Sequence, residues 1–135
     1  MSDQPNRIDN IAIRRLAPGD APALQAFYSG LSARSQRTFM PLGRAPTLDA
    51  YAQVARDNAP GVERRLDLVA WDEERIVGWG FVWLLDPCEP LFGLGVADAY
   101  QGRGLGSRLI DAVLAAARAR GLARIFLTVV KDNAV

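Results

Sequence analysis

The chain has 135 residues, of which 50% are hydrophobic and 23% are charged, a composition that fits one globular domain and is short for two. Sixteen basic against fifteen acidic residues leave a formal net charge of +1. This excludes a positive electrostatic field over the whole chain that would attract nucleic acid or an anionic membrane surface. With no histidine and one cysteine, Cys88, the chain lacks the residues for Ser-His-Asp catalysis, an internal disulfide and most zinc chemistry. The same absence of histidine, with a single cysteine, predicts no metal site. No run approaches the ~20 uncharged apolar residues of a membrane helix, so we expect a cytoplasmic protein.

The first part of the chain predicts a strand followed by two helices. "IAIRRL" (Ile11–Leu16) is typical of a strand, and "APGD" after it opens a helical pattern that reaches Leu31. We expect the segment Ser32–Pro46 to be irregular, either lining a substrate cleft or forming a solvated connection. Thr47 has the character of an N-cap for a short helix, "LDAYAQVARD".

Two β-rich runs, "LDLVAWD" and "RIVGWGFVWLL", are joined by "DEER" and predict an antiparallel hairpin. Strict alternation along the second run gives two faces, with Val77, Trp79, Phe81, Trp83 and Leu85 on one and Ile76, Gly78, Gly80, Val82 and Leu84 on the other. Both faces are apolar, so we expect both to be buried. The two glycines on the second face are expected to let another element pack closely over the strand.

The last part predicts a strand, a helix and a second strand. "LFGLGVAD" is a strand in which Gly93 and Gly95 share one face, a pattern that indicates a bulge or a close approach of another group. Apolar residues then recur at helical spacing from Leu105 to Ala116, and "ARIFLTVV" is the last strand. A strand, helix, strand order of this kind predicts a parallel crossover.

Between the glycine-containing strand and this helix lies "DAYQGRGLGSRL". A helix start normally recruits an acid, yet the first acid after the glycines is Asp111, and Arg103 and Arg108 add positive charge. This pattern indicates that an anionic ligand completes the helix start. The alternative is a tight turn with Arg103 in solvent.

Three anion-binding motifs compete for this loop. The dinucleotide pattern G-x-G-x-x-G fails because Ser107 stands where the third glycine belongs, and a Walker A loop fails because the first lysine of the chain is Lys131. A plain nucleotide- or phosphate-binding domain is therefore disfavoured. What remains is Q-x-x-G-x-G, from Gln101 to Gly106.

That pattern resembles the pyrophosphate loop of the GNAT superfamily of acetyl-CoA-dependent N-acetyltransferases. Its surroundings, "IVGWGFV", "LGVADAYQ" and "RIFLTVVKDNA", agree with the resemblance, which extends over nearly the whole chain. It implies an α/β fold, a mixed and mostly antiparallel sheet flanked by helices, in a single domain over residues 1–135. It also implies acetyl-CoA as cosubstrate.

The resemblance implies a coenzyme site built mainly from backbone. The N–H groups of the loop would wrap the pyrophosphate, and the pantetheine arm would run along the strand before the loop. This strand would separate from the next parallel strand, and the thioester would lie in the opening, where the N–H of Val96 would polarise its carbonyl. The glycines of that strand are interpreted as room for the arm. The implied coenzyme-binding residues are Leu94, Gly95, Val96, Gln101, Gly102, Arg103, Gly104, Leu105, Gly106, Ser107 and Asn133.

The chain departs from the family pattern at its end. It stops after "KDNA", where the family continues with a helix and two strands, so the resemblance implies a C-terminally incomplete domain. No residue can then be assigned to protonate the leaving thiolate, and the last strand would be an exposed edge, available for a homodimer. Glu89 is the nearest candidate for the base that takes the proton of the amine, with a solvated turn residue as the alternative.

These observations predict transfer of an acetyl group from acetyl-CoA to a primary amine of a small molecule or protein, by direct attack in a ternary complex. A non-catalytic acyl-CoA-binding module is the alternative, because the coenzyme loop is complete while the acid is not assigned. Neither nucleic acid nor a membrane is expected as a partner.

Overall fold

The computed structural model describes residues 10–43, 46–59, 65–84, 91–119 and 126–127. These residues form a five-stranded sheet with neighbours in the order β1-β2-β3-β4-β5. The strands are β1 (Ala12–Arg15), β2 (Arg65–Asp72), β3 (Arg75–Trp83), β4 (Leu91–Val96) and β5 (Phe126–Leu127). The first four pair antiparallel and β5 pairs parallel with β4, which confirms the predicted mixed, mostly antiparallel sheet.

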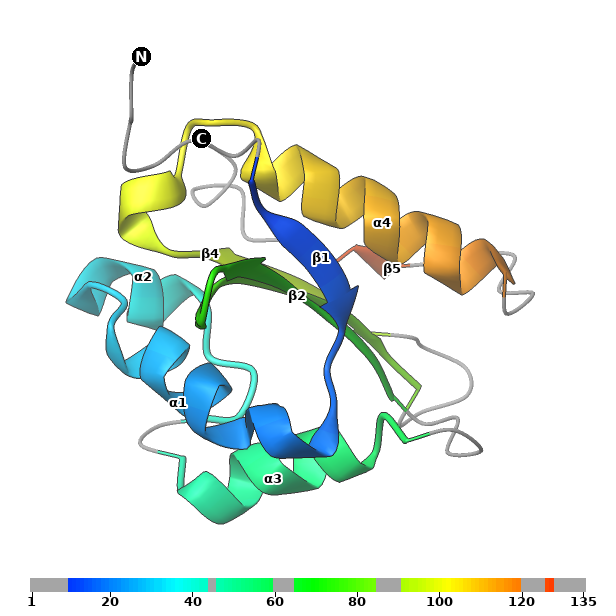
Figure 1. Ribbon diagram of the computed structural model, residues 1–135, viewed down its shortest axis with the longest axis horizontal. Coiled ribbons are helices and arrows are strands. Elements are labelled where there is room, and N and C mark those ends of the chain that lie inside the picture. Colours follow the sequence, from blue (N-terminus) through cyan, green and yellow to red (C-terminus); the bar gives the residue numbers. More distant parts are fainter. Residues whose placement is uncertain (1–9, 44–45, 60–64, 85–90, 120–125, 128–135) are drawn as a thin grey trace.

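Helices cover the sheet on both faces. Figure 1 shows α4 on one face and α1, α2 and α3 on the other. Their bounds, with two 3-10 turns, are η1 (Pro18–Asp20), α1 (Ala21–Ser29), α2 (Ala33–Thr38), α3 (Leu48–Arg56), η2 (Asp98–Tyr100) and α4 (Leu105–Ala119). The hydroxyl of Thr47 accepts a hydrogen bond from the N–H of Ala50, so the predicted N-cap of α3 is confirmed. Among the described residues, no helix combines the length and apolarity needed to cross a membrane.

Helix α2 corrects the expectation of an irregular segment between Ser32 and Pro46. Ser32 caps this helix, because its side chain accepts a hydrogen bond from the N–H of Ser35. All six residues of α2 are exposed or half-buried, so the helix has no apolar periodicity that the sequence could reveal.

Both faces of β3 are buried, as predicted, but Val77 lies on the opposite face from the one expected. The register between β2 and β3 shifts at this point, because Ala70 pairs with Gly78 while Trp71 pairs with Ile76. One extra residue on β3 reverses the alternation. Ile76 therefore packs in the cluster of Trp79, and Val77 packs in the cluster under α4.

Two glycines of β3 explain how closely α4 packs. A Cβ atom on Gly78 would lie 2.6 Å from Cδ1 of Leu109, and one on Gly80 would lie 3.1 Å from Cγ2 of Val113. The side chains of Leu109 and Val113 are both fully buried. The expectation that these glycines admit a close neighbour is confirmed, and the neighbour is α4.

The core on the side of α1 and α3 contains a buried carboxylate that the sequence did not reveal. Asp67 is fully buried on β2 and accepts hydrogen bonds from Trp79 Nε1 at 2.7 Å, from Trp83 Nε1 at 3.1 Å and from Asn58 Nδ2 at 2.9 Å. Burial raises the pKa of Asp67 to about 6, although these hydrogen bonds act to lower it. The indole N–H groups of two core tryptophans are satisfied by this one side chain.

Candidate functional site

The glycine loop joins η2 to α4 with backbone that glycine favours. Gly102 has a φ of +75° and Gly104 a φ of +86°, in the left-handed region where other residues are strained. The N–H of Arg108 donates to the carbonyl of Gly104 at 3.1 Å. The N–H groups just before it in the first turn, those of Leu105 to Ser107, therefore have no intrahelical acceptor.

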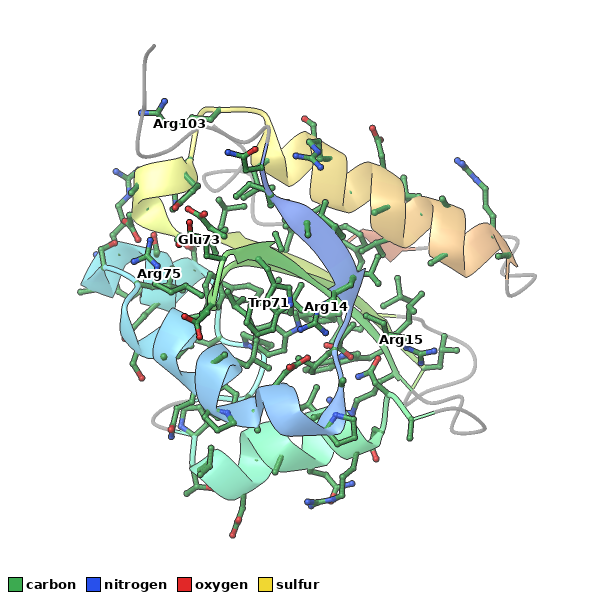
Figure 2. All side chains as sticks on the ribbon, viewed as in Figure 1. Arg14, Arg15, Trp71, Glu73, Arg75 and Arg103 are labelled. Carbon is green, nitrogen blue, oxygen red and sulfur yellow. The ribbon has the colours of Figure 1, made fainter. Side chains whose placement is uncertain are left out.

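The charge of this helix start is positive. The first turn of α4, all of it described, contains no acidic residue. Figure 2 shows Arg103 at the turn that leads into α4, where the side chain is exposed and its Nε donates to the carbonyl of Ala99 at 3.3 Å. Arg108 Nη2 donates to the carbonyl of Ile11 at 3.3 Å, so this guanidinium reaches toward the start of β1. The partial positive charge of the helix end is thus open to an anion.

Polar side chains hold the loop against its neighbours. Gln101 Nε2 donates to the carbonyl of Val96 at 2.9 Å and to Ser35 Oγ at 3.4 Å. Asp98 accepts from the N–H of Ser32 at 3.1 Å and from Ser35 Oγ at 3.3 Å. Burial tends to raise the pKa of Asp98, but these hydrogen bonds outweigh it and the pKa is lowered.

Tyr100 anchors the other side of the loop. Its ring is buried, its hydroxyl donates to the carboxylate of Asp72, and Arg75 donates to the hydroxyl at 3.4 Å. Burial, with Asp72 as the second cause, raises the pKa of Tyr100. Tyr100 thus fixes the loop to the hairpin between β2 and β3.

The edge of β4 next to the loop offers backbone N–H groups. The N–H of Ala97 donates to the carbonyl of Val77 at 2.9 Å, in register with the pairing of Gly95 and Trp79. Because hydrogen bonding alternates along an antiparallel strand, the N–H groups of Leu94 and Val96 point away from β3. Within the described part of the chain, β5 pairs only with the other end of β4, at Leu91 and Phe92.

The loop and this edge are adjacent. A Cβ atom on Gly106 would lie 3.6 Å from Leu94 Cδ2 and 3.8 Å from Val96 Cγ2. The first turn of α4 therefore packs against the two residues of β4 whose N–H groups point away from β3.

The glycines of β4 have a different role from the one interpreted from the sequence. A Cβ atom on Gly95 would lie 2.6 Å from the ring of Phe39, and one on Gly93 would collide with the ring of Phe81. These glycines make room for aromatic rings on the face of the sheet rather than for a ligand arm. The edge of β4, not this face, is where an extended ligand can pair.

Two predicted residues, Glu89 and Asn133, lie outside the described residues, as does Cys88. The structure also contains a cavity that the sequence did not indicate, about 410 Å³ in volume, beside η2. It is lined by α1, the start of β3 and η2, with Ala26, Gly30, Arg75, Asp98 and Tyr100 among its walls. Residues from separate parts of the chain form it, so no local sequence pattern predicts it.

Comparison with known proteins gives a family and a fold. The model of the acetyltransferase (GNAT) family matches residues 32–135. Mycothiol acetyltransferase from Corynebacterium glutamicum strain R is 39% identical over 67 residues, which are 49% of this chain and 23% of that protein. The enzyme of the same name from Acidothermus cellulolyticus is 41% identical over 59 residues, covering 41% of this chain and 18% of that one. The matches thus span less than a quarter of these relatives.

Solved structures match over most of the chain. The GNAT domain of S. lividans PAT is 25% identical, with a TM-score of 0.73, and the match covers 90% of this chain and 73% of that one. A GNAT-family acetyltransferase from Streptococcus pneumoniae is 24% identical, with a TM-score of 0.74 and coverage of 92% and 77%. The PaiA N-acetyltransferase from Thermoplasma acidophilum, solved in complex with coenzyme A, shares the fold at 14% identity, with a TM-score of 0.71 and coverage of 91% and 81%. The family match and the shared fold agree with the glycine loop that precedes α4, and the chain belongs to the acetyltransferase (GNAT) family.

Proposed function

We propose that this protein transfers the acetyl group of acetyl-CoA to a primary amine of a small molecule or a peptide. The observation that carries the proposal is that the glycine loop and the acid-free first turn of α4 lie beside Leu94 and Val96, whose N–H groups point away from β3. Membership of an acetyltransferase family supports the group transferred, and a structural neighbour solved with coenzyme A supports the donor.

The residues present suit the coenzyme chemically. A pyrophosphate needs several N–H donors and a positive environment, which the first turn of α4 supplies without a competing acid. A Cβ atom on Gly102 would meet no atom within 4 Å, so the outer side of the loop leaves space for phosphate groups. An extended pantetheine arm carries amides that can pair with the outward groups of β4 as an added strand would.

In the proposed reaction the chain contributes mainly position and backbone donors. Acetyl-CoA, when bound, supplies an acetyl group activated as a thioester. The N–H of Val96 points away from β3 and is the candidate donor to the thioester oxygen, and Leu94 and Gly95 would align the arm along the strand. In the overall exchange the amine nitrogen gains the acetyl group and loses one proton, and the coenzyme leaves as its free thiol. We assign Glu89, which lies outside the described residues, as the candidate base.

Calorimetric titration with acetyl-CoA, coenzyme A and ATP tests the coenzyme site. We expect the first two to bind and ATP to bind at least about tenfold more weakly, because it lacks the arm that pairs with β4. Release of free thiol from acetyl-CoA is then followed with peptides bearing free N-termini, lysine peptides, polyamines and aminoglycosides. Turnover with one class supports the transferase. Binding without turnover by any amine would instead support an acyl-CoA-binding module, and no binding by the folded chain would refute both.

A further inference from the structure

Helix α2 is held in place by polar contacts. It is six residues long, and its own residues are exposed or half-buried, so neither intrinsic helix stability nor apolar burial fixes its N-terminal end. On the side of α1, Gln36 Nε2 donates to the carbonyl of Tyr28 at 3.0 Å and to that of Leu31 at 3.2 Å. The contacts at its N-terminal end come from the glycine-loop region.

Asp98 makes those contacts. One carboxylate oxygen accepts from the N–H of Ser32, the N-cap of α2, at 3.1 Å, and the other accepts from Ser35 Oγ at 3.3 Å. Ser35 Oγ in turn accepts from Gln101 Nε2 at 3.4 Å, and the same nitrogen donates to the carbonyl of Val96 at 2.9 Å. A chain of hydrogen bonds thus joins the start of α2 to the glycine loop and to the end of β4.

The other end of α2 reaches the face of β4. Phe39 is its C-cap, and the N–H of Phe39 donates to the carbonyl of Ser35 at 3.0 Å. The buried Phe39 ring lies edge-on to Trp79, with 5.5 Å between ring centroids, and fills the space above Gly95. Gly95 lies between Leu94 and Val96, whose N–H groups form the proposed thioester edge. One short helix therefore connects the glycine loop to the face of β4 next to the proposed position of the thioester.

We propose that Asp98 is a positioning residue that couples occupation of the glycine loop by coenzyme to the placement of α2 and Phe39 beside β4. The inference rests on the proposed function, because it concerns the same coenzyme site. A ligand that orders the loop also holds Asp98 and Gln101 in place, and these two side chains carry that order to α2. By linkage, a change that loosens α2 weakens coenzyme binding by the same factor that coenzyme tightens α2.

Hydrogen exchange of the backbone N–H groups in residues 32–39, with and without coenzyme A, tests the coupling. In the unchanged chain we expect coenzyme A to slow exchange there by about tenfold, a factor that matches the stabilisation given by a hydrogen bond to a charged acceptor. In Asp98→Ala we expect about tenfold faster exchange in the free protein and loss of the coenzyme-dependent slowing, with coenzyme affinity lowered by no more than about tenfold. Asp111→Ala removes another exposed carboxylate, on α4, and should behave as the unchanged chain.

Two further variants separate coupling from loss of folding. Asp98→Asn keeps one oxygen for the N–H of Ser32 and should restore part of the slowing, while Ser35→Ala removes the link to Gln101 and should remove part of it. Equal coenzyme-dependent slowing in Asp98→Ala and the unchanged chain would overturn the coupling alone. Failure of coenzyme A to bind the unchanged chain would overturn the proposed function and the coupling together.

Discussion

A single methyl group placed at two positions of the glycine loop should have opposite effects on stability. Gly104 has a φ of +86°, where an alanine costs about 1–2 kcal/mol because its Cβ crowds the backbone. Gly106 lies in the first turn of α4, and a Cβ atom there would be 3.6 Å and 3.8 Å from its nearest neighbours, which are ordinary contact distances. Alanine is favoured over glycine in a helix by up to about 1 kcal/mol.

We therefore expect Gly104→Ala to lower the free energy of unfolding and Gly106→Ala to leave it unchanged or raise it, with a difference of about 2 kcal/mol between the variants. With a urea m-value of about 2 kcal/mol per molar, this difference corresponds to a separation of about 1 M between the unfolding midpoints. Urea unfolding followed by tryptophan fluorescence measures it. Equal midpoints, or a lower midpoint for Gly106→Ala, would refute the assignment of the left-handed backbone to Gly104.

Three further predictions concern the core and α3. The folded-state pKa of Asp67, about 6, is above its ordinary value of 3.8, so only the folded chain takes up this proton as pH falls from 7 to 5. The carboxyl then adds about 1 kcal/mol of stability, and the loss of stability in Asp67→Asn, measured by urea unfolding, should be larger at pH 5 than at pH 7 by that amount; a constant loss would contradict it. Gly95→Ala should cost about 1–3 kcal/mol because the new methyl group meets the Phe39 ring, and much less in a Phe39→Leu background, as a double-mutant cycle would measure; additive effects would contradict the contact. Thr47→Ala should lower the free energy of unfolding by about 1 kcal/mol, because it removes the cap of α3, whereas Thr47→Ser should not; equal losses in both variants would point to packing instead.

The sequence predicts those parts of the fold whose signal is local. The hairpin, the cap at Thr47 and the helix after the glycine loop each follow from alternation, capping chemistry or helical spacing, and the structure confirms them. The face of Val77 could not be predicted, because a bulge depends on how two strands pair and leaves no mark in one of them. Helix α2 was missed for a related reason: it has no apolar periodicity of its own, and part of what holds its N-terminal end is Asp98, more than 60 positions away in the chain.

In the candidate site, too, the sequence predicts the features that depend on local residues and not those that depend on tertiary contacts. The need for glycine at positions 102 and 104 was visible in the sequence, and the positive φ angles give it a physical cause. The role of the β4 glycines was not, because the rings that cover Gly93 and Gly95 come from another strand and from the end of α2. A glycine pattern tells that something approaches closely, while only the tertiary fold tells what it is.

The central claim is that the first turn of α4 binds the pyrophosphate of the coenzyme. Calorimetric titration of Ser107→Glu and Ser107→Gln with coenzyme A tests it most directly, because Ser107 is an exposed residue of that turn and the two variants differ only in charge. Glutamate suits a helix N-terminus, so both variants should fold at least as stably as the unchanged chain. One negative charge about 6 Å from a doubly charged pyrophosphate costs roughly 1.4 kcal/mol even at the dielectric constant of water. We expect Ser107→Glu to bind coenzyme A at least about tenfold more weakly than Ser107→Gln, and equal affinities in the two variants would contradict the claim.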